Sequence, residues 1–394
     1  MRILQVTQAY YPFNERGGPA IKVRSIARVL AGLGNEVTVL TADLGFGPRE
    51  IEAAKVVGDP DGWRTDLDGV EVVYFKTRCH YRNLTINPGI LRFCRRHLKE
   101  FDIVHIYGLY DTLGPAVGRY CRRLGIPYFL EPLGMTRSID RGFLLKRIWK
   151  RLAKNYLGQA SKWIATSCLE RHDLSAEGVP SEKVLLRYNG IDLNDFKKLP
   201  PVGAFRKSVG IANNDPIILF LGRLIPRKGA DLLIEALPQI GDENVKLVIV
   251  GPEGESGYQT FLRDRAKSLG VSHQVLFPGP LYEDMQKEAY VDATVFALPS
   301  RYENFGNTVA EAIACGTPAV VSDRCGIAPL IDQRAGLVTS YDSQAVARTL
   351  KELLNNPPLY QRLKGGCLQV ANEISWEGLV REMQESYKEA ISRA

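Results

Sequence analysis

Short apolar runs rich in β-branched residues recur along the whole chain, and segments with helical spacing lie between most of them. One series of these runs occupies residues 2–7, 36–41, 70–75, 102–107, 127–130 and 162–167, and a second occupies 216–222, 245–251, 275–279, 294–299 and 318–323. Strands that alternate with helices build parallel sheets, because each helix crosses the sheet and returns the chain to the same edge. The pattern predicts an α/β protein with two parallel-sheet domains.

A polar segment, NDFKKLPPVG at residues 194–203, separates the two series of strands. Its two prolines and its glycine interrupt the periodicity, which is typical of a connection between domains. We predict an N-terminal domain at residues 1–196, a C-terminal domain at 204–375, and a helix at 376–394 that packs back on the N-terminal domain. A ligand cleft is expected between the two domains, because small-molecule sites often lie at domain interfaces.

The composition of the 394 residues, 45% hydrophobic and 24% charged, is that of an ordinary globular protein. The first residues enter a strand pattern directly, without the features of a signal peptide, and no apolar stretch is long enough to span a bilayer. We therefore expect a cytoplasmic location. The seven cysteines are scattered and never spaced as CxxC, which favours buried free thiols over disulfides or a zinc site.

Positive charge is concentrated in the first half of the chain. Residues 1–200 contain 31 Lys and Arg against 21 Asp and Glu, whereas residues 201–394 contain 20 against 23. The segment from Phe143 to Trp163 carries cations, no acid and an apolar stripe at helical spacing. Such a helix either contacts an anionic membrane or packs its stripe on its own domain. A second basic segment at 92–101 favours an anionic or lipid-linked acceptor, and no nucleic-acid-binding motif accompanies the charge.

Two loops of the second half have the residues that an anion site requires. Gly222 allows a tight exit from a strand, and Arg223 and Lys228 follow it before the next helix. Open α/β sheets bind ligands at the carboxyl ends of their strands, which is where these two cations lie. The other loop begins a helix whose backbone amides can bind an anion, at Gly306, Asn307 and Thr308. Together the two loops predict a diphosphate pocket.

Two glutamates, Glu303 and Glu311, lie on either side of that helix start. Carboxylates repel phosphate but accept hydrogen bonds from hydroxyl groups, so sugars are the groups that these side chains suit. A nucleotide sugar contains a diphosphate between two sugars. Taken alone, such a pair of glutamates would usually be two solvated residues of a helix surface.

Four motifs together resemble the family 4 retaining glycosyltransferases of the GT-B fold, in which two Rossmann-like domains face each other across a cleft. They are the E-x7-E pair of Glu303 and Glu311, GRLIPRKG at 222–229, YNGID at 188–192, and GGPAIKVRSIARVLAGLGNEVTVLT at 17–41. The motifs occur in the family's order and span nearly the whole chain. The resemblance implies a hexosyltransferase of polysaccharide biosynthesis, which moves a sugar from a nucleotide sugar, with UDP favoured, to a glycan or lipid-linked glycan.

The resemblance implies roles for individual residues. Arg223 and Lys228 would hold the donor diphosphate, Glu303 would contact the hydroxyls of the transferred sugar, and Glu311 would contact the ribose. Arg223, Lys228 and Glu303 are therefore the candidate catalytic residues. The remaining donor-binding candidates are Gly17, Gly18, Gly222, Asn304, Phe305, Gly306, Asn307 and Thr308.

The acceptor side departs from the family pattern. His105 and Tyr107 are the acceptor-side candidates, although Tyr107 stands where a second histidine is common, and Leu133 replaces a histidine in the segment EPLGM. His105 lies on an apolar strand, so it is at least equally compatible with a hydrogen-bonded histidine of the core.

No metal or cofactor is implied, because fixed cations can stabilise a diphosphate leaving group as a metal ion would. Two D-x-D matches, at residues 59–61 and 66–68, are interpreted as acids of an irregular charged loop. In retaining members of the family the acceptor is thought to attack from the leaving group's side, so a protein nucleophile is not assumed. The alternatives are a GT-B nucleotide-sugar epimerase, a sugar phosphorylase, and a non-catalytic nucleotide-sugar binding protein.

Overall fold

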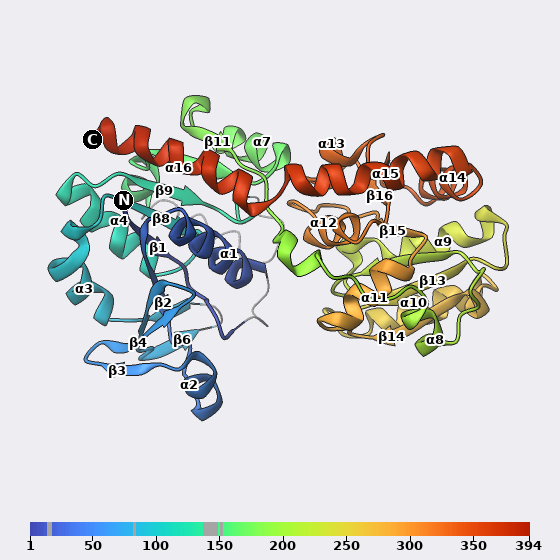
Figure 1. Ribbon diagram of the computed structural model, residues 1–394, viewed down its shortest axis with the longest axis horizontal. Helices are drawn as coiled ribbons and strands as arrows, with labels where there is room; N and C mark the ends of the chain where they lie inside the picture. Colours follow the sequence, from blue (N-terminus) through green and yellow to red (C-terminus); the bar gives the residue numbers. More distant parts are fainter. Residues whose placement is uncertain (14–17, 82–83, 137–148, 150–152) are drawn as a thin grey trace. The chain divides into compact units, whose positions relative to one another are not determined.

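The computed structural model describes residues 1–13, 18–81, 84–136, 149 and 153–394, which form two compact units (Figure 1). Unit 1 comprises Met1–Asn189 and Trp376–Ala394, and unit 2 comprises Gly190–Ser375. The chain enters unit 2 before the polar segment that marks the boundary in the sequence. The reason is that Ile191 pairs with Ser375 and its amide donates to the carbonyl of Ile374 at 2.9 Å, within unit 2.

Unit 1 is built on a nine-stranded sheet in the order β11-β10-β9-β8-β1-β2-β5-β4-β3. The strands are β1 (Arg2–Val6), β2 (Glu36–Ala42), β3 (Val57–Asp59), β4 (Gly62–Leu67), β5 (Val70–Phe75), β8 (Ile103–Tyr107), β9 (Tyr128–Glu131), β10 (Lys162–Ala165) and β11 (Val184–Leu186). All pairs from β11 to β5 are parallel, whereas β4 and β3 are antiparallel at one edge. A separate hairpin consists of β6 (Cys79–Tyr81) and β7 (Leu84–Ile86).

The interpretation of the D-x-D acids as residues of an irregular loop is wrong for Asp59 and Asp66, which lie in the hairpin of β3 and β4, whereas Asp61 and Asp68 do lie in turns. Acids of both D-x-D segments are paired with arginines: Asp59 lies 2.7 Å from Arg64, and Asp68 lies 3.0 Å from Arg24. Charged residues on an edge strand conceal its strand character in the sequence, since such strands use charge to prevent pairing with other chains.

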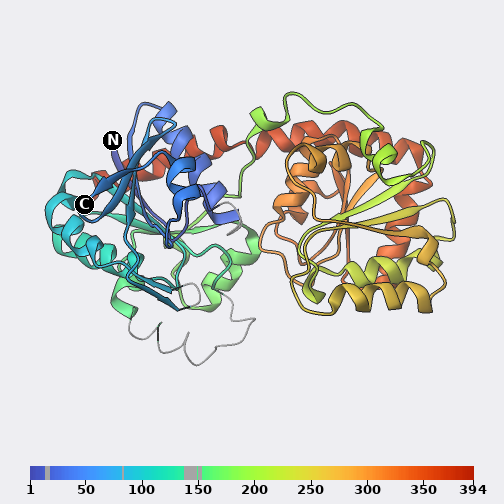
Figure 2. The ribbon, with the colours of Figure 1, turned by 90° about the horizontal axis from the view of Figure 1, so that it is seen from below.

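Helices cover both faces of the unit 1 sheet (Figure 2). They are α1 (Gly18–Gly32), α2 (Pro48–Ala54), α3 (Gly89–His97), α4 (Leu113–Leu124), α6 (Lys154–Gly158), α7 (Cys168–Ala176) and α16 (Trp376–Ser392), with short 3-10 turns η2 (Leu98–Glu100) and η3 (Ser181–Lys183). One core cluster includes Phe93 of α3 and Val117 of α4, and another includes Ile26 of α1 and Met383 of α16. Helices α1 and α16 pack together although they lie at opposite ends of the chain.

Unit 2 contains a six-stranded parallel sheet in the order β14-β13-β12-β15-β16-β17. Its strands are β12 (Ile217–Leu221), β13 (Lys246–Val250), β14 (Val275–Gly279), β15 (Val295–Leu298), β16 (Ala319–Ser322) and β17 (Gly336–Thr339). The chain proceeds outward from β12 in one direction and from β15 in the other. The carboxyl ends of β12 and β15 therefore lie at a topological switch point, where open α/β sheets bind their ligands.

The helices of unit 2 connect these strands and pack on the sheet. They are α8 (Ala204–Val209), α9 (Ala230–Ile240), α10 (Tyr258–Ser268), α11 (Asp284–Asp292), α12 (Asn307–Ala314), α13 (Ala328–Ile331), α14 (Ser343–Leu354) and α15 (Pro357–Glu373), with 3-10 turns η4 (Leu193–Phe196), η5 (Pro226–Lys228) and η6 (Ser272–Gln274). The cysteines of the chain are free thiols, as predicted, and most are buried; Cys79 is exposed and Cys168 partly exposed.

Candidate functional site

The switch point of unit 2 brings together two of the predicted loops, one after β12 and one after β15. The amide of Arg301 donates to the carbonyl of Arg227 at 2.8 Å, which joins the loops through their backbones. Gly229 has a φ of +75°, and a Cβ atom there would lie 2.1 Å from the carbonyl oxygen of Pro299. Only glycine permits this approach, which holds η5 and its Lys228 against the loop after β15.

A third loop fixes the other side of Glu303. The amide of Glu303 donates to the carbonyl of Arg324 at 3.0 Å, and the amide of Gly326 donates to the carbonyl of Glu303 at 2.9 Å. Two residues further on, the amide of Ile327 donates to the carbonyl of Phe305 at 2.8 Å. Glu303 is therefore held by its backbone on both sides, so its carboxylate is positioned by a rigid loop.

Lys228 and Glu303 form an ion pair in which Nζ of Lys228 donates to Oε2 of Glu303. Their side chains are only 16% and 18% exposed, which partly shields the pair from solvent. The residue predicted to hold the diphosphate and the residue predicted to contact the sugar are thus in direct contact. Each charge compensates the other.

Arg223 differs from Lys228 although both follow the same strand. It is exposed, and its side chain has no hydrogen bond or ion pair with any residue in the described ranges. Gly222, which precedes it, is partly buried and links β12 to β13 through its amide, 3.0 Å from the carbonyl of Val250. The donors of the Arg223 guanidinium are thus not used by any acceptor in the part of the chain that the structure describes.

The start of α12 has the geometry of a tight loop-to-helix connection. Gly306 has a φ of +111°, and a Cβ atom there would lie 3.0 Å from Sγ of Cys325. Phe305 is buried beneath the loop, whereas Asn304 and Thr308 are partly exposed and Asn307 is exposed. The carbonyl of Gly306 accepts from the amides of Val309 and Ala310 at 3.0 and 3.1 Å, which closes the first turn of α12. The N-terminal end of the helix carries a partial positive charge, which suits an anion.

Glu311 lies one turn further along α12 and accepts a hydrogen bond of 2.8 Å from the hydroxyl of Tyr290. Burial raises the pKa of Glu311 to about 7, although the Tyr290 hydrogen bond opposes the shift. Tyr290 is itself fixed, because the hydroxyl of Thr317 donates to its backbone carbonyl at 2.6 Å. Near neutral pH this carboxyl group can therefore be a hydrogen-bond donor as well as an acceptor.

The acceptor-side candidates lie in the core of unit 1. His105 has no exposed surface, and a hydrogen bond of 2.6 Å joins its Nδ1 to the hydroxyl of Tyr387 on α16. Tyr107 is also buried and stacks on the His105 ring with the ring centroids 4.1 Å apart. Burial lowers the pKa of His105, although neighbouring Glu131 opposes the shift. This arrangement favours the interpretation of His105 as a core histidine.

A buried charge cluster in unit 1 was not predicted from the sequence. Glu131, at the end of β9, forms ion pairs with Lys22 of α1 and with Arg187, and its Oε2 lies 3.4 Å from Nε2 of His105. Burial would raise the pKa of Glu131, but the charges of Arg187 and Lys22 hold it well below its usual range. The signal in the sequence is a carboxylate that directly follows an apolar strand run, at the edge where ligand sites form.

The charge cluster also contacts both points at which the chain leaves unit 1. Lys22 donates to Oδ1 of Asn189, the last residue before unit 2. The guanidinium of Arg187 lies 5.4 Å from the ring centroid of Trp376, the first residue after unit 2. Glu131 is therefore linked through Lys22 to Asn189 and through Arg187 to Trp376, the two residues of unit 1 at which the chain crosses to unit 2.

Other predicted features are only partly visible. Gly17 and residues 143–148 and 150–152 lie outside the described residues, whereas Gly18 begins α1. In the described remainder of the segment between Phe143 and Trp163, Tyr156 and Trp163 belong to a core cluster of unit 1, and Trp149 packs against that cluster. No helix within the described ranges is both long and apolar enough to cross a membrane. In the same ranges, no three His, Cys, Asp or Glu side chains are grouped so that they could hold a metal ion.

Family models match both halves of the chain. The model described as glycosyl transferases group 1 matches residues 202–365, and that described as a glycosyl transferase 4-like domain matches residues 17–190. The chain belongs to this glycosyltransferase family. An uncharacterized glycosyltransferase of Methanocaldococcus jannaschii is 29% identical, with 99% of each chain covered. A D-inositol 3-phosphate glycosyltransferase of Xylanimonas cellulosilytica is 28% identical over 96% of this glycosyltransferase and 93% of its own length.

Solved structures give the fold of this glycosyltransferase. HepE of Anabaena in complex with UDP has a TM-score of 0.78 at 21% identity, with 99% of this chain and 100% of that chain covered. Sucrose-phosphate synthase of Thermosynechococcus elongatus has a TM-score of 0.75 at 21% identity, with 100% of both chains covered. Two parallel-sheet α/β domains and these neighbours confirm the predicted GT-B fold with its Rossmann-like domains.

Proposed function

We propose that this glycosyltransferase moves a sugar from a nucleoside diphosphate sugar, with UDP as the favoured nucleotide, to a hydroxyl of a glycan or lipid-linked glycan. We further propose that the anomeric configuration is retained and that no metal ion is required. The observation that carries the proposal is the convergence of Arg223, Lys228 and Glu303 at the switch point of unit 2.

The cations of this site suit a diphosphate leaving group. Arg223 has an uncommitted guanidinium, Lys228 lies on the adjoining turn, and the first amides of α12 add a partial positive charge. Charge that develops on the leaving diphosphate would be stabilised by these fixed groups without reorganisation of solvent. A divalent metal ion would then have no necessary part in the departure of the diphosphate.

The two glutamates suit the two sugars of the donor. Nζ of Lys228 donates to Glu303, and in the complex it would donate to a phosphate oxygen of the donor instead. The carboxylate of Glu303 could then accept hydrogen bonds from the transferred sugar. Glu311, with its raised pKa, can donate to one ribose oxygen and accept from a hydroxyl. Retention of configuration would follow if the acceptor hydroxyl attacks on the side of the leaving group and gives its proton to the phosphate. No protein nucleophile is required for this step.

The acceptor is proposed from charge alone. The basic composition of residues 1–200 suits an anionic or lipid-linked glycan, and the segment between Phe143 and Trp163 is a proposed contact with an anionic membrane. A cytoplasmic location, at the inner face of the membrane, is part of the same proposal.

Product analysis with a panel of nucleotide sugars tests the function. The enzyme is incubated with UDP-, GDP- and ADP-sugars together with glycan and lipid-linked acceptors, and the products are analysed by NMR. We expect release of UDP and an acceptor glycoside with the donor's anomeric configuration. An isomerised donor without transfer would indicate an epimerase, binding without turnover would indicate a non-catalytic protein, and an inverted product would contradict retention.

A further inference from the structure

Two helices of unit 1, α3 and α4, pack side by side on the same face of the sheet (Figure 2). Each buries one side in the same core cluster, α3 through Phe93 and Cys94 and α4 through Val117 and Cys121. Their other sides are directed to solvent together. We call the exposed residues of α3 and α4 the α3–α4 face.

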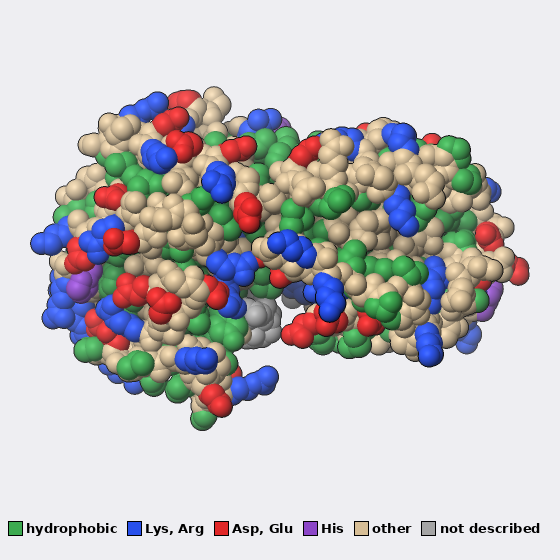
Figure 3. All heavy atoms as spheres, viewed as in Figure 1, with side chains coloured by type: hydrophobic (Ala, Val, Ile, Leu, Met, Phe, Trp, Pro, Cys, Tyr) green, Lys and Arg blue, Asp and Glu red, His purple; other side chains and the backbone are tan. Residues whose placement is uncertain are grey.

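The α3–α4 face is strongly cationic. Neither helix contains an acidic residue, and five exposed arginines lie on the pair: Arg95, Arg96, Arg119, Arg122 and Arg123. None of the five forms an ion pair with a residue that the structure describes. The exception on these helices is Arg92, which is paired with Asp61. Figure 3 shows the blue side chains that gather over α3. Uncompensated like charges at this density favour an anionic partner.

The arginines are organised around one tyrosine. Nε of Arg95 donates to the hydroxyl of Tyr120 at 3.1 Å, which connects α3 to α4. The guanidinium of Arg123 lies 5.7 Å from the centroid of the same ring. Tyrosine and arginine side chains of this kind sit well at the boundary between water and lipid, because each has an apolar body and a polar end.

Apolar side chains are also exposed on this face. Leu91 of α3 is 42% exposed and Leu124 of α4 is 48% exposed. Leucines among arginines distinguish this face from one that would bind nucleic acid or a soluble polyanion, since both gain little from exposed leucine. An anionic lipid surface binds both kinds of side chain, because its phosphates attract the arginines and its hydrocarbon boundary accommodates the leucines.

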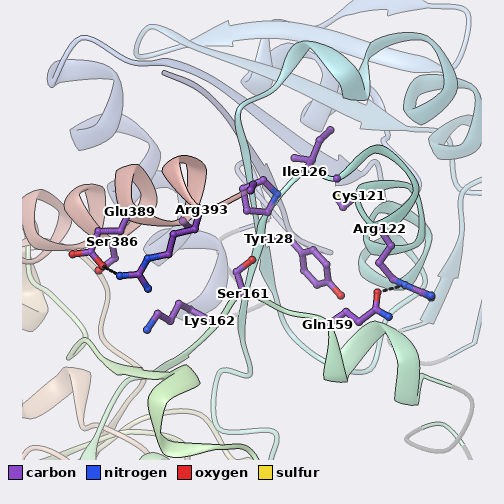
Figure 4. A pocket seen from close by; sticks show the side chains of 14 residues that line it. Cys121, Arg122, Ile126, Tyr128, Gln159, Ser161, Lys162, Ser386, Glu389 and Arg393 are labelled. Carbon is purple, nitrogen blue, oxygen red and sulfur yellow. Dashed lines mark hydrogen bonds and ion pairs between the residues drawn. The ribbon is translucent and has the colours of Figure 1, made fainter.

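A cavity of about 290 Å³ extends the cationic character beyond the end of α4 (Figure 4). Arg122 and Lys162 line it, together with Arg393 and Glu389, which are paired with each other at 3.9 Å. The cavity lies at the amino ends of β9 and β10, opposite the carboxyl ends where a substrate site is expected. It is therefore separate from the proposed transfer chemistry.

We propose that the α3–α4 face docks on an anionic lipid surface, with phosphate headgroups at its arginines and at the mouth of the adjoining cavity. This inference rests on the proposed function in one respect, since a lipid-linked acceptor explains why the enzyme would dock there. The docking itself requires no turnover and can be measured without donor or acceptor.

Sedimentation with lipid vesicles tests this inference. The full-length protein is mixed at 0.1 M salt with vesicles of phosphatidylcholine containing 30% phosphatidylglycerol, or with phosphatidylcholine alone. We expect binding to the anionic vesicles only. The triple variant Arg96→Gln, Arg119→Gln, Arg123→Gln should bind roughly a hundredfold more weakly, because each cation near an anionic surface contributes about a fivefold factor. A control variant, Lys207→Gln, Lys267→Gln, Lys351→Gln, removes three exposed cations from unit 2 and should bind as the wild type does.

The remaining outcomes decide against the inference. Equal binding by the triple variant and the control would place the contact elsewhere on the chain, and binding to random RNA but not to vesicles would identify a different partner.

A second pair of substitutions, Leu91→Ser and Leu124→Ser, leaves the charge unchanged and should weaken vesicle binding severalfold, whereas binding by charge alone would leave it unaltered. UDP release from soluble donors is measured on the same variants. Its absence in the wild type would contradict the proposed function but leave the vesicle result standing.

Discussion

Nζ of Lys228 donates to Oε2 of Glu303 across two loops whose backbones are themselves hydrogen-bonded to each other. The ion pair links the group proposed to hold the phosphate to the group proposed to hold the sugar. A ligand that binds one of them alone leaves the other partly shielded and without its partner, which costs free energy. A nucleotide sugar bound as proposed would satisfy both at once, so the pair would favour the intact donor over its separate parts.

Removal of either cation should impair turnover. We expect Arg223→Ala and Lys228→Ala each to reduce kcat/KM roughly 10²–10³-fold, because each removes a charge opposite the leaving diphosphate. Only Lys228→Ala should also lower stability, by about 1 kcal/mol, since Arg223 has no protein partner among the described residues. Steady-state kinetics and urea unfolding measure the two effects. Near wild-type turnover in a folded variant would contradict the diphosphate assignment.

Substitution of the two glutamates should affect different steps, the rate for Glu303 and nucleotide binding for Glu311. Glu303→Gln should chiefly reduce kcat and bind free UDP almost normally, because UDP lacks the transferred sugar. At pH 8, above the pKa of about 7 for Glu311, Glu311→Gln should bind UDP roughly tenfold more weakly, because the amide group has one acceptor oxygen where the carboxylate has two. Titration calorimetry with UDP separates the cases. The reverse order would exchange the two roles, and no effect from either substitution would contradict both assignments.

Stability should depend on pH through Glu311. Its pKa in the folded protein is about 7, against 4.5 as its ordinary value, so the folded state holds the proton more tightly. The contribution of this group is fully present below pH 4.5 and is lost as pH rises to about 7, by about 3 kcal/mol. Relative to the wild type, Glu311→Gln should gain stability between pH 5 and pH 8. Urea unfolding at the two pH values measures the difference, and parallel curves would contradict the raised pKa.

Activity should persist in excess EDTA, because the leaving group is expected to be stabilised by Arg223, Lys228 and the α12 amides. The rate of UDP release is compared with and without EDTA, and then after addition of Mg²⁺. Similar rates in all three conditions are expected. A loss that Mg²⁺ restores would show that the cations are insufficient and would revive a metal-dependent mechanism.

His105 should contribute to stability and not to acceptor use. Tyr387→Phe removes the hydroxyl at 2.6 Å from its Nδ1, and we expect a loss of about 1 kcal/mol in unfolding free energy with an unchanged KM for the acceptor. The control is Tyr360→Phe, on an exposed part of α15 in unit 2, which should leave stability unchanged. An increase in acceptor KM for Tyr387→Phe alone would restore an acceptor-side role for His105.

Much of the fold follows from local pattern. The buried parallel strands appear in the sequence as apolar runs, because helices cover them on both faces. The hairpin of β3 and β4 does not, because glycine, polar and charged residues interrupt any apolar run in its strands, and β17 is concealed because Gly336 and Thr339 shorten its apolar run. The loop residues of the candidate site were identified individually, since strand ends and helix starts have local signals.

The contacts within the site could not be predicted in the same way. Lys228 and Glu303 are 75 positions apart, and their contact depends on the strand order that places β12 beside β15. Glu131 depends on three other segments of the chain for its partners. Burial also changes roles: His105 looks like a catalytic histidine in a motif but lies without exposed surface in the core.

The anchoring of both chain crossings at Glu131 makes one buried group responsible for two distant parts of unit 1. Asn189 and Trp376 are held through Lys22 and Arg187 to a single carboxylate. Within unit 2, the amide of Ile191 donates to the carbonyl of Ile374, so the residues next to the crossings are also joined to each other. Helix α16 begins at Trp376, so the start of this helix and the end of the N-terminal part of unit 1 depend on the same carboxylate.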